Sequence, residues 1–234
     1  MWGSIARRAT PLLAIVAAYP LPADANGIAV GQTTIVFHNG QDAHALTVMD
    51  PGAESVRVQA RLFRWHGGDL DTYEPTGDIG FSPAIFTIEP GSTQIVRLVV
   101  QTQRTTQEAA YRLFVDELPP PPRADKIQLP VRLVIPVFVE GTHPAGPPSL
   151  VWTASMQAGR LALTANNKGG MRARISDLGY RENGRDRMIA AGLAGYVLAG
   201  DRHVWNFPFR GTALEISART EQGDIHQSVP LTSP

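Results

Sequence analysis

The chain has 234 residues, enough for one or two domains that each bury a hydrophobic core. Lys plus Arg and Asp plus Glu number 21 each, so the formal net charge is zero and nothing global indicates nucleic acid or an anionic membrane as a partner. There is no cysteine, which excludes disulfide scaffolds, thiolate metal sites and thiol nucleophiles.

The N-terminus has the three-part pattern of a secretory signal peptide. Arg7 and Arg8 precede an apolar segment that begins at Pro11, and Ala23-Asp24-Ala25 follows as an A-x-A cleavage site. The apolar segment is interrupted by prolines and is shorter than the ~20 residues that a membrane-spanning helix needs. We therefore expect residues 1–25 to be a cleaved signal, with export and no stable membrane insertion.

Short apolar runs separated by turn residues follow the signal. Together with 22 Gly and 19 Pro, this pattern favours an all-β chain. The first group of strands is expected at residues 28–37, 43–49, 56–65, 84–88, 93–100 and 111–117. Residues 66–79 read as a loop rich in Gly and Asp, and the proline run at 118–125 reads as a stiff, polyproline-like connector.

The connector leads to an unusually long candidate strand at residues 126–140, KIQLPVRLVIPVFVE. Successive side chains of a strand point to opposite faces, so residues of odd number form one aliphatic row. At about 3.3 Å per residue, residues 127–137 would extend about 36 Å, roughly twice the commonest strand length. The strand is either an ordinary sandwich strand with a rich core face or one that lends part of its row to another protein. The row consists of Ile127, Leu129, Val131, Leu133, Ile135 and Val137.

Two prolines in this strand predict which of its sides faces outward. Pro130 and Pro136 are both even-numbered, and proline has no N–H to donate to a ladder. If the strand is regular, its odd-numbered N–H groups pair with the strand at 111–117, and the proline side faces outward. An added strand would then use the N–H groups of Gln128, Arg132 and Val134, whereas a bulge at either proline would reverse this argument.

Residues 140–148 have the Gly- and Pro-rich composition of a domain boundary, and the strand pattern resumes after them. Further strands are expected at 150–156, 160–165, 172–180, 194–198, 203–209, 214–219 and near 227–231. Seven or so short strands in the first part indicate an immunoglobulin-like sandwich, and the second part is a smaller β-domain. We therefore predict domains at 26–142 and 148–234.

The other candidate motifs do not indicate a catalytic or metal-binding site. The sequence has no hydrolase, dinucleotide or P-loop motif, so no enzyme and no cofactor is expected. The acidic residues of the 66–79 loop lack calcium-loop spacing. Met171, Arg172 and Arg174 are interpreted as a solvated strand face, with a partner face as the alternative, and Tyr111 as a sandwich corner tyrosine. The histidines are scattered without metal-ligand spacing: His38, His44, His66, His143, His203 and His226.

An ordered set of segments resembles the PapD-like periplasmic chaperones of the chaperone–usher pathway of pilus assembly. The segments are 55–65 (SVRVQARLFRW), 82–91 (SPAIFTIEPG), 94–97 (QIVR), 111–119 (YRLFVDELP) and, in the second domain, 161–174. The resemblance covers nearly all of the mature chain and is closest to the branch serving archaic or spore-coat-U-like pili.

The resemblance implies two immunoglobulin-like β-sandwich domains in a boomerang arrangement. Such a chaperone works in the periplasm, caps pilin subunits by donor-strand complementation and delivers them to an outer-membrane usher. The donor row would be Ile127, Leu129, Val131, Leu133 and Ile135.

In the family, basic residues in the cleft hold the C-terminal carboxylate of the subunit. The better-studied branch has one of them in the first strand, but residues 28–37 contain no Lys or Arg. The candidate anchors are therefore Arg112, Arg132 and Lys126. The alternative function is an exported two-domain immunoglobulin-like adhesion or surface protein whose long strand is only core.

Overall fold

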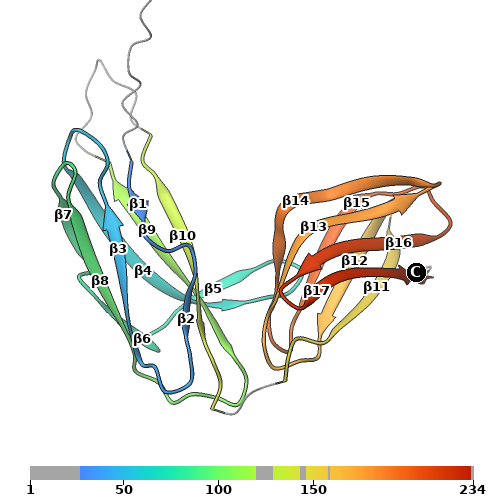
Figure 1. Cartoon of the computed structure of the whole chain (residues 1–234), viewed down its shortest axis with the longest axis horizontal. Helices are drawn as coiled ribbons and strands as arrows, with labels where there is room; N and C mark the ends of the chain where they lie inside the picture. The colour runs from blue at the N-terminus through green and yellow to red at the C-terminus, as the bar shows by residue number, and fades with distance from the viewer. Residues whose placement is uncertain (1–26, 120–128, 143–145, 158, 233–234) are drawn as a thin grey trace, which may run out of the picture.

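The computed structural model describes residues 27–119, 129–142, 146–157 and 159–232. The expected signal peptide, Lys126, Ile127 and Gln128 lie outside the described residues. The described chain forms two β-sandwiches set at an angle, with the notch between them open on one side (Figure 1). No helix in the described part of the chain is long and apolar enough to cross a membrane.

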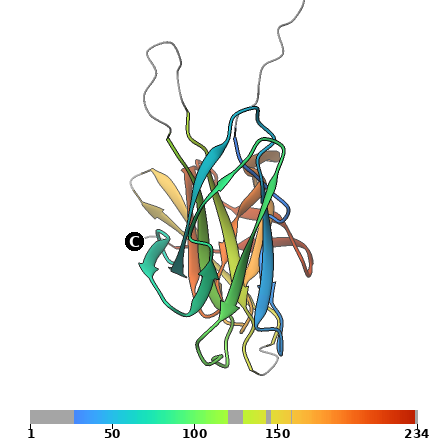
Figure 2. The same cartoon turned by 90° about the vertical axis from the view of Figure 1, so that its left-hand side faces the viewer.

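The first sandwich packs a four-stranded sheet against a six-stranded one, and Figure 2 shows it facing the viewer. The four-stranded sheet has the order β1 (Ala29–Val30), β3 (Ala43–Met49), β8 (Thr93–Val100) and β6 (Ile79–Ser82). The other has the order β2 (Ile35–Phe37), β10 (Arg132–Val139), β9 (Ala109–Leu118), β4 (Val56–His66) and β5 (Thr72–Pro75), with β7 (Ile85–Ile88) also paired to β4.

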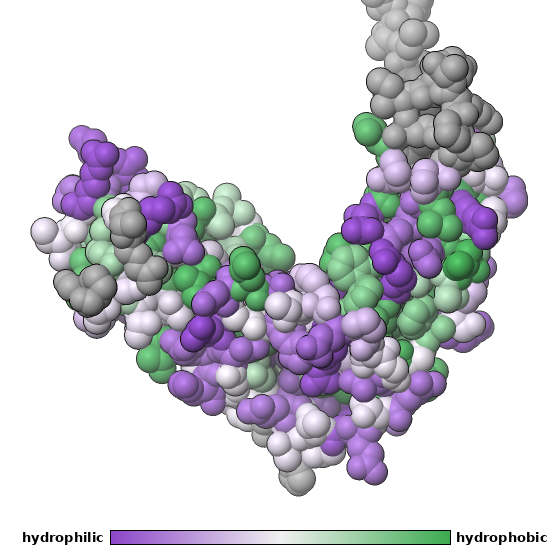
Figure 3. Space-filling view, turned by 180° about the vertical axis from the view of Figure 1, so that it is seen from behind, coloured by the Kyte–Doolittle hydropathy of each residue, from purple (hydrophilic) through white to green (hydrophobic). Residues whose placement is uncertain are grey.

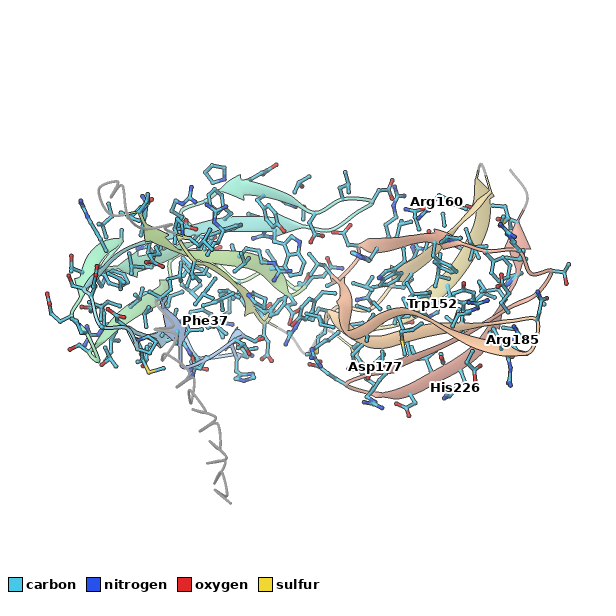
Figure 4. The ribbon with its side chains drawn as sticks, turned by 90° about the horizontal axis from the view of Figure 1, so that it is seen from above. Phe37, Trp152, Arg160, Asp177, Arg185 and His226 are labelled. Atoms are coloured by element: carbon cyan, nitrogen blue, oxygen red, sulfur yellow. The ribbon has the colours of Figure 1, made fainter. Side chains whose placement is uncertain are left out.

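The expected alternation places one face of each sheet in the core between them. Phe37, Leu46, Val58 and Leu113 are among the fully buried residues of this core, and Figure 4 shows Phe37 inside the first sandwich. The core is continuous from one sheet to the other, so the sheet pair is held by apolar burial. The predicted ranges 43–49 and 93–100 coincide with β3 and β8.

Two expectations for the first sandwich are wrong. Residues 28–37 do not form one strand: β1 pairs with β3 in one sheet, and β2 pairs with β10 in the other. The chain therefore crosses between the sheets after Val30. Residues 66–79 are not only a loop, because β5 returns along β4 and Ile79 begins β6.

The second sandwich packs two four-stranded sheets together. One has the order β15 (Arg202–Pro208), β12 (Arg160–Asn167), β11 (Leu150–Gln157) and β18 (Leu231–Thr232). The other has the order β14 (Arg185–Val197), β13 (Ala173–Glu182), β16 (Leu214–Thr220) and β17 (Gly223–Val229). Trp152 and Trp205 stack in its core with ring centroids 5.6 Å apart, and Figure 4 shows Trp152 inside this sandwich.

Strand β14 is much longer than the expected segment at 194–198. It starts at Arg185, directly after a two-residue turn formed by Asn183 and Gly184. Both turn residues have positive φ, 50° and 77°, as a hairpin turn of the I′ type requires. The first half of β14 is exposed and carries charged residues, so it has no apolar alternation that sequence inspection would detect. The prediction of an all-β chain with two sandwiches is confirmed.

The two sandwiches meet through a small apolar cluster. It consists of Trp65, Ala110 and Phe138 from the first sandwich and Tyr196 and Leu198 from the second, with Val36 packed against it. The rings of Trp65 and Tyr196 meet edge to face with centroids 5.7 Å apart. The cluster includes a residue of β10, so the position of the second sandwich depends on that strand.

Two ion pairs also link the two sandwiches. Glu108 forms an almost fully buried ion pair with Arg172 across the interface, and its carboxylate also accepts the backbone N–H of Arg172 at 3.0 Å. The Arg172 guanidinium lies 3.8 Å from the ring centroid of Phe138. The expectation that Arg172 is solvated is therefore wrong. A second pair, Asp69 with Arg202 at 3.0 Å, is exposed.

These two pairs predict very different mutational costs. Arg172→Met leaves the Glu108 carboxylate buried without its cation, which typically costs about 3–5 kcal/mol. Asp69→Asn removes an exposed pair and should cost less than about 1 kcal/mol. Urea titrations followed by tryptophan fluorescence should show a large decrease in the unfolding midpoint for Arg172→Met only. Equal decreases for both variants would contradict the role assigned to Glu108 and Arg172.

Candidate functional site

The outer edge of β10 lacks a neighbouring strand over part of its length. β2 runs beside β10 only from Val137 to Val139. From Arg132 to Pro136, β10 pairs with β9 on its inner side, and no described strand lies on its outer side. This edge lies on the side of the first sandwich that borders the notch (Figure 1). Unpaired strand edges bind other strands readily, so this edge is the candidate site.

The hydrogen bonds confirm the sides predicted from the prolines. The N–H of Glu117 donates to the carbonyl of Val131 at 2.9 Å, so the odd-numbered residues of β10 are the ones that exchange bonds with β9. On the other side, the N–H of Glu140 donates to the carbonyl of Phe37 at 3.0 Å. The register from Arg132 to Val139 is unbroken, so Pro136 causes no bulge. Beyond Pro136, however, the side of β10 that lacks the proline N–H groups does not face outward, because β2 pairs with it there.

The aliphatic row lies at the mouth of the first sandwich. Leu129 is 82% exposed, whereas Val131 and Leu133 are half-buried and pack against the margin of the core. Ile135 is only 2% exposed and belongs to the core itself. Of the described donor candidates, three therefore have apolar surface available to a partner, and Ile135 is already used within its own domain.

Arg112 lies at the point where the unpaired edge ends. It pairs in register with Pro136, the last residue of β10 before β2 begins. Its guanidinium lies 3.7 Å from the ring centroid of Trp65 and 5.8 Å from that of Tyr196 in the second sandwich. Its Nε is buried without a hydrogen-bond partner. The guanidinium as a whole is half-buried, so an incoming anion would meet its charge and its remaining N–H groups rather than this buried N–H.

Burial is the main influence on the charge of Arg112. It lowers the pKa of the guanidinium, and the neighbouring Tyr73 and Asp71 raise that pKa in part. Arginine remains protonated in proteins because its ordinary pKa exceeds 12. Arg112 is therefore a partly desolvated cation, and an added carboxylate would be held more strongly there than at an exposed arginine.

Arg132 has a different environment. It pairs with Asp116, and Arg61 donates to the same carboxylate at 2.6 Å. Burial raises the pKa of Asp116, but the hydrogen bonds from Arg132 and Arg61 outweigh burial and hold that pKa below its ordinary value. Two cations thus share one anion, and Arg132 is itself exposed. Of the predicted anchors, Arg112 lies between aromatic rings and Arg132 is paired with Asp116; Lys126 lies outside the described residues.

The remaining predicted features are structural. Tyr111 is fully buried, accepts a hydrogen bond from Arg64 at 2.8 Å and donates to Asp78 at 3.0 Å. Desolvation raises the pKa of Tyr111 to about 12. The described residues contain no group of three His, Asp or Glu side chains that would hold a metal ion. Two acidic residues of the 66–79 segment form ion pairs instead: Asp69 pairs with Arg202 and Asp78 pairs with Arg64.

Sequence inspection missed the aromatic environment of Arg112. Trp65 was assigned only to the end of a strand, and Tyr196 lies in the second domain, far away in the sequence. Phe138 was seen as an apolar residue of the long strand, without its contact to Arg172. The available signal was compositional: large aromatic residues near the end of a strand frequently mark a contact between elements.

One protein family matches the first half of the chain. The family model for pili and flagellar-assembly chaperones, PapD N-terminal domain, matches residues 27–146, more than half of the chain. No curated protein matches the chain significantly.

Several solved structures share the fold. One is the CsuC–CsuE chaperone–tip adhesion subunit pre-assembly complex from archaic Csu pili of Acinetobacter baumannii, with 23% identity, coverage of 88% of this chain and 99% of that chain, and a TM-score of 0.68. Others are the Salmonella enterica complex of SafA pilin with the SafB chaperone (14% identity, 88% and 98% coverage, TM-score 0.63) and the Pseudomonas aeruginosa CupB2 chaperone (16% identity, 87% and 100% coverage, TM-score 0.60).

The family match and the two-sandwich fold together confirm the resemblance seen in the sequence. They favour a pilus chaperone over an adhesion or surface protein and indicate a non-enzymatic role. The chain belongs to the PapD family of pili and flagellar-assembly chaperones and is a pilus-assembly chaperone.

Proposed function

We propose that this chaperone holds an immature pilin subunit by lending it the unpaired edge of β10 and the residues that precede it. The observation that carries the proposal is the coincidence of three features at one place. The backbone edge from Arg132 to Pro136 is unpaired, exposed or half-exposed aliphatic side chains lie beside it, and a desolvated arginine marks its end.

The backbone supplies the first part of the interaction. The outward N–H groups on this edge belong to Arg132 and Val134, and their carbonyls alternate with them. An extended segment of the subunit would pair with these groups, as in β-strand addition at an exposed sheet edge. Pro130 and Pro136 contribute no N–H, so the ladder offered to a partner is short. This limits self-pairing of the free chaperone while leaving donors for a subunit.

The direction of the added strand follows from where the edge stops. β2 occupies the edge from Val137 onward, so an added strand must end near Pro136, beside Arg112. The terminal carboxylate reaches Arg112 only if the added strand runs in the same direction as β10. An antiparallel strand would place its N-terminal end there, beside a cation. We therefore propose parallel pairing with Arg112 as the carboxylate anchor.

The aliphatic row supplies the apolar part. Leu129, Val131 and Leu133 line the mouth between the two sheets, so a subunit docked at the edge would extend the core of the first sandwich. Complete burial of a large aliphatic side chain stabilises by about 1.5–3 kcal/mol, which gives at most about 4.5–9 kcal/mol for the three residues. Ordering of both partners and the partial burial already present reduce this gain. Ile127 would continue the row, whereas Ile135 stays in its own core.

The cellular setting completes the proposal. Residues 1–25 act as a signal peptide that directs the chain to the periplasm, where domains 26–142 and 148–234 form the mature chaperone. The chaperone hands the subunit to an outer-membrane usher without a cofactor and without catalysis. Similar solved structures support the choice of partner, since they include chaperones in complex with a pilin or a tip adhesion subunit.

The first test replaces the aliphatic row. Leu129→Asp, Val131→Asp and Leu133→Asp would each place an unpaired charge in an apolar groove, which is strongly unfavourable. In cells that also express a pilin subunit encoded in the same gene cluster, we expect normal export of the chaperone and loss of the subunit by proteolysis or aggregation. Ile95→Asp, at a 41% exposed position on the other sheet, is the control and should preserve the subunit. Normal subunit yield with all three row variants would refute the proposal.

The second test addresses the anchor. A carboxylate prefers a charge-assisted bond from arginine, so Arg112→Ala and Arg132→Ala should weaken subunit capture more than Arg57→Ala or Arg97→Ala. Losing one charged hydrogen bond corresponds to about 1.5–3 kcal/mol, or roughly a tenfold to hundredfold decrease in affinity. We expect the larger loss at Arg112. Co-purification at several salt concentrations measures the effect, and equal losses at all four positions would show that no specific anchor exists.

A further inference from the structure

An aromatic strip lies on the face of the six-stranded sheet that is turned away from the first core. We define the strip as Phe63 of β4, Tyr73 of β5, Phe114 of β9 and Val134 of β10. Phe114 contacts Phe63 and Tyr73 edge to face, with ring centroids 5.3 and 5.7 Å apart. Val134 is the register partner of Phe114 on the next strand. Four neighbouring strands thus contribute one continuous apolar surface.

The strip is accessible. Tyr73 is 41% and Val134 is 42% exposed, while Phe63 and Phe114 are half-buried by one another and by neighbouring side chains. Figure 3 shows hydrophobic surface on both walls of the notch. The second sandwich contacts the same sheet face nearer the C-terminal end of β10, at Trp65 and Phe138. This contact leaves the strip uncovered.

Arginines flank the strip along the direction of the strands. On one side Arg61 and Arg132 share Asp116, and their guanidinium groups lie 5.9 Å from the ring centroid of Phe63 and 5.6 Å from that of Phe114. Among these described side chains, two cations and one anion leave an excess positive charge. On the other side is Arg112, the register partner of Phe63 and the proposed carboxylate anchor. The chain has no net charge, so this positive character is local.

We infer, on the basis of the proposed function, that the aromatic strip recognises alternate side chains of the subunit's C-terminal strand: an apolar side chain two residues before the terminal carboxylate and an acidic one four residues before it. The strip is continuous with the edge to which that strand would be added, through Val134. The occupant is therefore the segment already paired to β10. Its negative groups, the terminal carboxylate and the acidic side chain, complement the arginines on the two sides of the strip.

The spacing follows from the parallel register. With the terminal residue level with Pro136 and Arg112, the second residue before it is level with Val134 and Phe114, and the fourth is level with Arg132 and Asp116. Side chains of alternate residues share one face of a sheet and are about 6.6 Å apart along a strand. An apolar group at the first level packs on Val134 and can reach the near edge of the Phe114 ring on the next strand, and a carboxylate at the second lies beside Arg132, the nearer of the two arginines.

Labelled octapeptides and the mature chaperone test this pattern. The reference peptide has a free C-terminal carboxylate, Phe two residues before the end and Glu four residues before it. Matched peptides replace Phe with Ser, Glu with Lys, or the carboxylate with an amide. We expect fluorescence anisotropy to show that each replacement weakens binding by about fivefold or more, as loss of one buried apolar group or one charge contact implies.

Two chaperone variants assign the effect to the strip. Val134→Ser and Val99→Ser remove the same side chain at exposed strand positions, 42% and 45% exposed, on opposite sheets. We expect Val134→Ser to reduce the preference for Phe over Ser and Val99→Ser to leave it unchanged. Circular dichroism spectra that match those of the unaltered chain establish that both variants are folded.

Each other outcome overturns the inference. If the peptides bind through their carboxylate and Arg112, but the Phe and Glu replacements have no effect, strand capture stands and side-chain recognition by the strip is wrong. If no peptide binds in a carboxylate-dependent way, both the anchor and the strip are wrong. If Val134→Ser changes only the sedimentation behaviour of the free chaperone, the strip is a contact between two copies of this chain.

Discussion

The structure depends on how the backbone hydrogen bonds of β10 are shared among its neighbours. The segment that sequence inspection treated as one strand divides into β1 and β2, which pair in different sheets. β2 satisfies the outer edge of β10 only from Val137, and the edge before it has no described neighbour. In water these groups are solvated at little cost, but they are also ready to pair with another strand. Without that division, a longer strand beside β10 would cover this edge and leave no backbone groups of β10 for another strand.

The same strand also connects the site to the second sandwich. Phe138 lies in the apolar cluster between the sandwiches and beneath the guanidinium of Arg172, which is paired with Glu108. Burial raises the pKa of Glu108, and the pair with Arg172 offsets only part of that effect. Breaking a buried pair of this kind is costly, because it leaves an uncompensated charge in the interior. The pair's place beside Phe138 means that the notch and the unpaired edge are held in a fixed relation.

Sequence inspection predicted the parts that follow from local periodicity. β3 and β8 alternate cleanly because each has one buried face, so their limits matched. Which side of β10 pairs with β9 was predicted from Pro130 and Pro136, because proline has no N–H to donate to a neighbouring strand. Periodicity does not say which sheet a strand joins, so the division of residues 28–37 was not predicted. An exposed strand such as the first half of β14 has no apolar row, and it was missed for that reason.

The candidate site was only partly predictable, because its charges depend on contacts between distant segments. Arg112 and Arg132 were both chosen by position in the sequence. Arg132 is already paired with Asp116, whereas Arg112 has a buried, unpartnered Nε between aromatic rings from two domains. Spacing along one chain cannot distinguish an arginine that shares a carboxylate from one that is packed between aromatic rings. The difference matters because Arg112, which has no carboxylate partner of this kind, would interact more strongly with an incoming carboxylate than Arg132. Arg112 also lies where β2 begins to cover the edge of β10. In the proposed binding mode the two features act together: the unpaired edge sets where a bound strand ends, and the cation beside that end favours the direction that places the terminal carboxylate there.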